Sequence, residues 1–136
     1  AYEIKECDWS SDVCSSDLEK QMATFLSTLL NSATNAHFFH WSTDSFSKHM
    51  ALGTYYDEIV DLTDALAEAY FGCYGKITTF PNTSHTPTDP LKYIESLQSF
   101  VKEARSDLPQ ESQFVQLIDN IAELLDTTAY KLKFLK

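Results

Sequence analysis

The chain has 136 residues, 43% of them hydrophobic, and a formal charge of −10, which suits one domain with a single core. No apolar run approaches the roughly 20 residues of a membrane span, and no signal peptide is visible. An acidic chain without a lysine cluster is a poor electrostatic match for DNA. We therefore expect a cytoplasmic protein that binds no membrane and, without a basic tail, no DNA.

The first eighteen residues differ in origin from the rest of the sequence. Residues 8–18 (DWSSDVCSSDL) match the translation of a sequencing-library adapter, and residues 1–7 fit its outer part and an index. We expect residues 1–18 to be a non-native tail, so that the natural N-terminus is missing. Residues 19–136 then carry 15 acidic and nine basic residues, a charge of −6. Cys73 becomes the one native cysteine, which leaves no disulfide framework.

The remaining sequence predicts four helices in one domain. Apolar residues recur at spacings of three and four along the first helix, as expected for a buried stripe. Asp89 and Pro90 suit the N-cap and first position of the third helix. Residues 77–88 (ITTFPNTSHTPT) have the composition of a loop. The expected helices are residues 19–42, 45–76, 89–106 and 110–134.

The lengths of the connections constrain how these helices pack. The short connections between helices one and two and between three and four favour antiparallel hairpins. The twelve-residue connection between helices two and three spans up to about 40 Å, enough to run along the bundle. We expect an all-α, ferritin-like four-helix bundle with a long crossover between helices two and three. An ordinary up-down bundle is the alternative.

Four side chains in the first two helices are candidate metal ligands. His40 and His49 precede Asp64 and Glu68, whose spacing of four places both carboxylates on one helix face. Imidazole and carboxylate groups suit iron, zinc and manganese. The sequence thus predicts a metal site built on helices. The simpler alternatives are a core histidine at position 40, a surface histidine at position 49 and a solvated acidic face.

The second helix indicates where such a site would lie. On a helical projection its carboxylates fall within an arc of about 60°; they are Asp57, Asp61, Asp64 and Glu68. The opposite side should face the core, and it carries Leu52, Tyr56, Ile59, Leu66, Tyr70 and Cys73. Apolar residues beside the acidic arc suggest that something covers it; they are Phe46, Met50, Val60 and Phe71. We therefore expect a site between subunits.

These residues resemble the Dps family of mini-ferritins, within the ferritin-like superfamily. His40-Trp41 is similar to the family's His-Trp pair at the end of its first helix. His49 is similar to its second histidine if the intervening loop is three residues shorter. With that offset, Asp64 and Glu68 are similar to its Asp-x-x-x-Glu pair. The specific part of the resemblance is residues 40–68.

The resemblance implies a function and an assembly. It extends over residues 19–136, and residues 89–92 resemble the segment that opens the family's third helix. It implies Fe(II) oxidation by peroxide or dioxygen at a mono-iron or di-iron site between subunits, with Fe(III) stored in a hollow oligomer, from a dimer up to a dodecamer. The protein would then be a ferroxidase-type oxidoreductase. His37 and Trp41 would support the ligands or line the interface.

Two departures from the family pattern keep other functions open. Gly53 stands where the family has its third ligand, an aspartate, and Asp57 one turn later is a possible substitute. The family's basic DNA-binding tail is absent. Residues 55–57 and 68–70 also resemble ferritin-like proteins encoded by bacteriophages. The resemblances imply the cytoplasm of a bacterium or of a phage-infected host. The alternative is therefore a metal-inactive, ferritin-like structural or assembly protein of phage origin, and a DNA-condensing protein is third.

Overall fold

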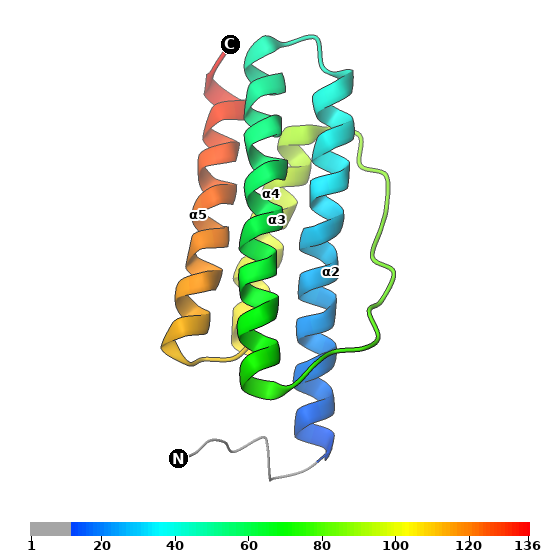
Figure 1. Cartoon of the computed structure of the whole chain (residues 1–136). Helices are drawn as coiled ribbons and strands as arrows, with labels where there is room; N and C mark the ends of the chain where they lie inside the picture. The colour runs from blue at the N-terminus through cyan, green and yellow to red at the C-terminus, as the bar shows by residue number, and fades with distance from the viewer. Residues whose placement is uncertain (1–11) are drawn as a thin grey trace.

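A computed structural model describes the backbone of residues 12–136 and the side chains from residue 17 onward. The first eleven residues of the expected non-native tail lie outside the described part. Within it the structure is helical and has no strand, which confirms the all-α class. The elements, shown in Figure 1, are α2 (Asp12–Ser42), α3 (Phe46–Tyr74), α4 (Pro90–Ala104), the 3-10 turn η2 (Arg105–Asp107) and α5 (Ser112–Phe134).

The helices form two hairpins joined by a long crossover (Figure 1). α2 and α3 run antiparallel, and residues 75–89 then return along α2 to the start of α4. α4 therefore runs in the same direction as α3, and α5 returns beside both. The α2–α3 turn and the C-terminus consequently lie at the same end of the bundle.

Local signals explain most of the helix boundaries. The Ser45 side chain accepts a hydrogen bond from the Lys48 backbone N–H, and Asp89 caps α4 in the same way, with a proline at the first helical position. α3 ends before Gly75, whose φ of 106° lies in the region that favours glycine. α2 begins at Asp12 rather than at the expected residue 19, because residues 12–18 contain neither proline nor glycine to stop it.

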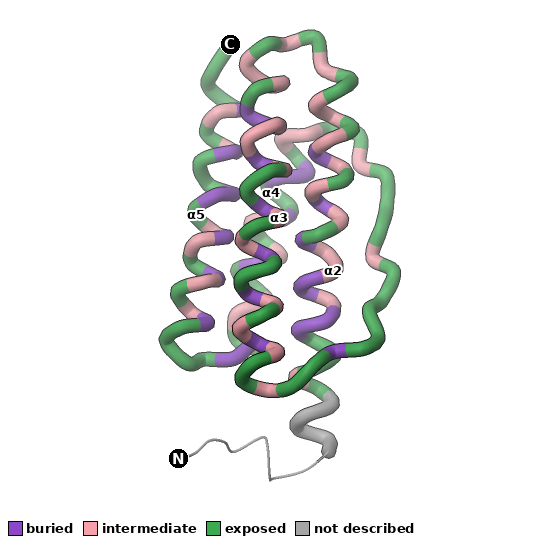
Figure 2. Tube along the Cα trace, in the orientation of Figure 1, coloured by how far each residue is buried: buried purple, intermediate pink, exposed green. Residues whose placement is uncertain are grey.

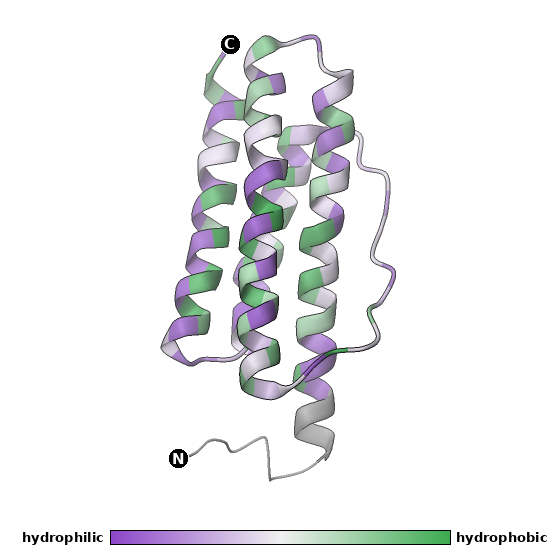
Figure 3. Cartoon of the chain, in the orientation of Figure 1, coloured by the Kyte–Doolittle hydropathy of each residue, from purple (hydrophilic) through white to green (hydrophobic). Residues whose placement is uncertain are grey.

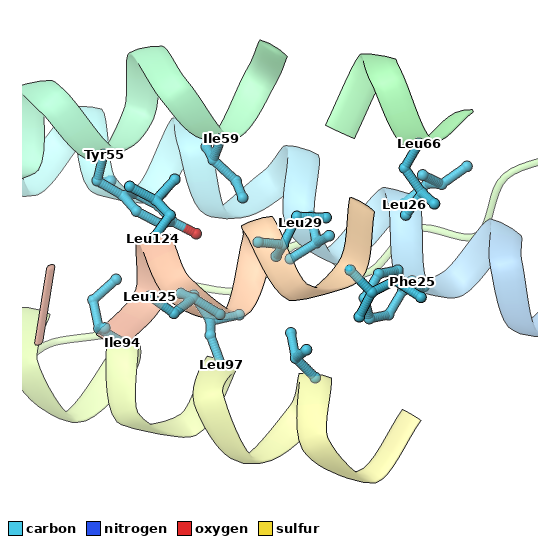
Figure 4. Packing of buried hydrophobic residues seen from close by; sticks show 14 of the residues in the cluster. Phe25, Leu26, Leu29, Tyr55, Ile59, Leu66, Ile94, Leu97, Leu124 and Leu125 are labelled. Atoms are coloured by element: carbon cyan, nitrogen blue, oxygen red, sulfur yellow. The ribbon is translucent and has the colours of Figure 1, made fainter. Parts of the chain in front are cut away.

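The core lies along the bundle axis, toward which α2, α3, α4 and α5 each turn buried residues (Figure 2). Most of these buried residues are apolar. Figure 3 shows the corresponding alternation of hydropathy along α3 and α5. Figure 4 shows part of this packing, with Phe25, Leu26, Leu29, Tyr55, Ile59, Leu66, Ile94, Leu97, Leu124 and Leu125 labelled. Each fully buried side chain of this size contributes about 1.5–3 kcal/mol. This shared core fixes the rotation of each helix and therefore which residues face outward.

The predicted inward face of α3 is largely correct. Leu52, Ile59, Leu66 and Tyr70 are buried. Tyr56 is half-buried and lies instead against α2. The prediction for Cys73 was wrong: it is exposed. In the final turn of α3 the neighbouring Tyr74 packs against Phe114 of α5 instead.

Hydrogen bonds inside the bundle and along the crossover hold α2 in register. Ser32 donates to the carbonyl of Leu29, so the fully buried Tyr55 hydroxyl donates to Ser32, at 2.7 Å. Outside the core, Asn31 donates to the Thr83 hydroxyl at 2.7 Å and so ties the crossover to α2. Across residues 12–136, no helix combines the length and apolar content needed to cross a membrane.

Candidate functional site at the α2–α3 end

His40 and His49 form a reciprocal pair between the end of α2 and the start of α3. The Nδ1 of His40 lies 2.6 Å from the carbonyl oxygen of His49, and the Nδ1 of His49 lies 2.9 Å from that of His40. The rings stack, with centroids 3.6 Å apart. Because a carbonyl only accepts, each Nδ1 carries a hydrogen, which leaves the Nε2 of each neutral imidazole with the lone pair. Both side chains are half-buried.

Gly53 provides the space for this pair. A Cβ at this position would lie 3.2 Å from Cε1 and 3.3 Å from Nδ1 of His40, closer than ordinary van der Waals contact. A glycine inside a helix costs about 1 kcal/mol relative to alanine. The close approach of the His40 ring explains why glycine nevertheless occupies position 53. The sequence interpretation treated Gly53 only as a missing ligand, whereas the structure gives it a packing role.

His37 and Trp41 extend the same cluster along the outer side of α2. The His37 ring stacks on Tyr56 of α3, with centroids 4.0 Å apart, and lies 4.6 Å from the Trp41 ring. Trp41 is nevertheless 67% exposed. His37 therefore helps to join the two helices, while Trp41 presents most of its surface to the outside.

The predicted carboxylates lie on the outward side of α3, away from the core. Asp57, Asp61, Asp64 and Glu68 are all exposed, as expected, and we name them the acidic row. Within the described residues none of them forms an ion pair. Asp64 follows His49 by fifteen residues, which is about 22 Å along the helix. The histidines therefore cannot bind the same ion as Asp64 or Glu68 of the same chain.

The expected metal site between subunits stays a prediction. No three His, Cys, Asp or Glu side chains in the described part of the chain lie close enough together to hold a metal ion. A site completed by a second copy is not tested by one chain. The structure thus brings His40 and His49 together and leaves Asp64 and Glu68 remote from them.

A groove separates the outward sides of α2 and α3. Its volume is about 590 Å³. It is lined by Ala33, Thr34, His37, Tyr56, Asp57, Val60 and Asp61. The groove therefore combines apolar and aromatic surface with two carboxylates of the acidic row.

Large apolar side chains are exposed at the end of the bundle that carries the α2–α3 turn. We name this surface the apolar end, and it comprises Phe38, Trp41, Phe46, Met50, Phe134 and Leu135, which are 44–76% exposed. The rings of Phe38 and Trp41 lie 5.8 Å apart. Ser47 donates to the carbonyl of Leu135 at 3.2 Å and so joins the end of α5 to the start of α3.

The apolar end is also basic. It carries four lysines, namely Lys48, Lys131, Lys133 and Lys136. The Nζ of Lys133 lies 5.5 Å from the centre of the Phe134 ring. In residues 37–50 and 130–136 Asp44 is the one acidic side chain. The sequence pointed to Phe46, Met50 and Trp41 as covered or interface residues. The contribution of α5 was not predicted, although the lysines of its last turns and the Tyr130–Phe134 spacing were visible signals.

Residues 12–136 thus form an all-α bundle of four helices with an exposed apolar end. Residues 40–132 match a family model described as a family of unknown function (DUF5856), and the chain belongs to that family. It is similar to the uncharacterized 14.6 kDa protein in the mobD-ri intergenic region of Enterobacteria phage T4, with 27% identity over 124 residues, 90% of this chain and 95% of that protein. No solved structure matches.

The family match corrects the resemblance to the Dps mini-ferritins and the ferritin-like superfamily. The matched region includes residues 40–68, on which that resemblance depended, and it belongs to a different family. The structure offers a physical reason for the error. His40 pairs with His49 and packs against Gly53, so the histidine spacing also serves the packing of one hairpin.

Proposed function

We propose that the protein is a self-associating structural subunit whose apolar end is covered by another copy of the chain. The observation that carries this proposal is the set of six exposed apolar side chains that surround one end of the bundle. At about 200 Å² for each large side chain, their exposed parts amount to roughly 700 Å². A stable interface buries about 800 Å² on each partner, so this surface is of the right size for a second copy.

The similarity to a phage protein suggests where such a subunit would act. A protein of phage T4 aligns over nearly its whole length with this chain. We therefore propose an assembly role in the cytoplasm of a phage-infected bacterial host. We further propose that the two hairpins and the crossover form a bundle of ferritin-like architecture, without homology to the ferritins.

The oligomeric state of the full chain tests self-association. Sedimentation equilibrium between about 1 and 100 μM should give a dimer or larger, and Phe46→Glu should weaken association by about 30-fold or more, as for a buried anchor residue. Phe80→Glu is the matched control, because Phe80 is 47% exposed on the crossover and should leave association unchanged. A wild-type chain that stays monomeric at 100 μM refutes the proposal, as does an equal effect of both substitutions.

Metal binding between copies is a second candidate, favoured by the His40–His49 geometry. Both Nδ1 atoms are bonded to carbonyl oxygens, the arrangement that orients histidine ligands and leaves Nε2 for a metal. We propose that these Nε2 atoms, which the stacked rings hold in nearly parallel planes, bind separate iron ions, with Asp64 and Glu68 of another copy as further ligands. Anaerobic titration of the assembled protein with Fe(II) should release heat, and Glu68→Ala should reduce it. No heat from the wild-type protein would reject this candidate.

A further inference from the structure

We infer that self-association joins unlike surfaces: the apolar end of one copy binds the acidic row and the adjoining groove of another. This inference rests on the proposed self-association and names the surface that the apolar end contacts. Such a contact can form twice in a two-fold pair or repeat from copy to copy. In both cases the same two surfaces meet.

The charges disfavour contacts between like surfaces. Two apolar ends in contact would bring together two sets of lysines, of which Lys133 lies beside the apolar ring of Phe134. Two acidic rows in contact would oppose two sets of four carboxylates. Juxtaposed like charges cost several kcal/mol in an interface. The end of one copy and the row of another, in contrast, carry opposite charges.

The acidic row is also available for such a contact. Its four side chains are exposed, and none is ion-paired within residues 17–136. From Asp57 to Glu68 the row extends about 16 Å along α3. This length is comparable to the distance across two of the three helix ends that form the apolar end, about 10 Å each.

The groove beside the row provides apolar surface for the aromatic side chains of the apolar end. Asp57 and Asp61 belong both to the row and to the lining of the groove, next to Tyr56 and Val60. A volume of about 590 Å³ accommodates more than one large side chain. Phe46, which is 76% exposed, is suited to enter it while the lysines contact the carboxylates. The two surfaces therefore match in apolar character as well as in charge.

Charge reversal tests which surfaces meet. One variant reverses the end, Lys133→Glu with Lys136→Glu, and a second reverses the row, Asp57→Lys with Asp61→Lys. All four side chains are exposed, so circular dichroism should show an unchanged fold. Each variant alone should associate at least about tenfold more weakly than the wild type. An equimolar mixture should regain wild-type association, because each end then meets a row of opposite charge.

The control reverses two exposed carboxylates of α4, Glu95→Lys with Glu103→Lys, and should associate as the wild type does. Association of the wild type should weaken between 0.05 and 0.5 M salt, by about tenfold, because exposed ion pairs are screened. If the wild type associates and neither reversal weakens it, the end-to-row contact is refuted while self-association stands. A mixture that does not recover also refutes it. A monomeric wild type refutes the proposed function itself.

Discussion

Replacing Gly53 by alanine tests whether the close approach of the His40 ring determines the residue at this position. The new Cβ would lie 3.2 Å from Cε1 and 3.3 Å from Nδ1 of His40. The ring must therefore move by a few tenths of an ångström. Its movement is limited by the His49 ring that stacks on it, with centroids 3.6 Å apart.

Two opposing contributions set the expected change in the free energy of unfolding for Gly53→Ala. Alanine in a helix interior is favoured over glycine by about 1 kcal/mol. Displacement of the His40 ring weakens its own hydrogen bond to the His49 carbonyl. Through the stacked His49 ring it also weakens the hydrogen bond of that ring to the His40 carbonyl, and each bond contributes about 1 kcal/mol. If both are lost, Gly53→Ala is less stable than the wild type by about 1 kcal/mol, a sign opposite to that of helix propensity.

Gly72→Ala is the matched control in the same helix. Nothing lies within 4 Å of a Cβ at position 72, so this substitution should stabilise the protein by about 0.5–1 kcal/mol. Urea unfolding followed by circular dichroism measures both variants. If Gly53→Ala stabilises as much as Gly72→Ala does, the reasoning about the ring is wrong.

Two further predictions concern the buried tyrosines. Ser32→Ala should cost about 1–3 kcal/mol because it leaves the buried Tyr55 hydroxyl without an acceptor. Tyr55→Phe should cost only about 1 kcal/mol because Ser32 still donates to the Leu29 carbonyl. Equal losses of stability in urea unfolding would contradict this direction of the hydrogen bonds. Burial raises the pKa of Tyr70 to about 12 and also raises that of Tyr55 above its usual value of 10.0. The unfolded chain releases these protons at lower pH, so stability should be intact below pH 10 and fall toward pH 12. Tyr70→Phe should lose less stability than the wild type over this pH range. If the two proteins have the same pH profile of stability in urea unfolding, the assignment to Tyr70 is wrong.

The sequence by itself determined the helices and their connections, because those depend on local signals. Capping by Ser45 and Asp89, the proline after Asp89 and the loop composition of residues 77–88 place most helix boundaries within a few residues. The apolar spacing of α3 also predicts that its carboxylates face outward. Each of these properties requires only the backbone geometry of one helix or turn.

The tertiary structure alone decided which side chains meet between elements. The pairing of His40 with His49 and the space provided by Gly53 depend on the exact register of α2 against α3. Cys73 is exposed because Tyr74, and not Cys73, faces α5 in the last turn of α3. The apolar end exists because the end of α5 lies beside the start of α3. Helical periodicity fixes the direction of a side chain from its own axis, but not the neighbour that it reaches. For the same reason, the spacing of histidines and acids suggested a metal-binding family to which the chain does not belong.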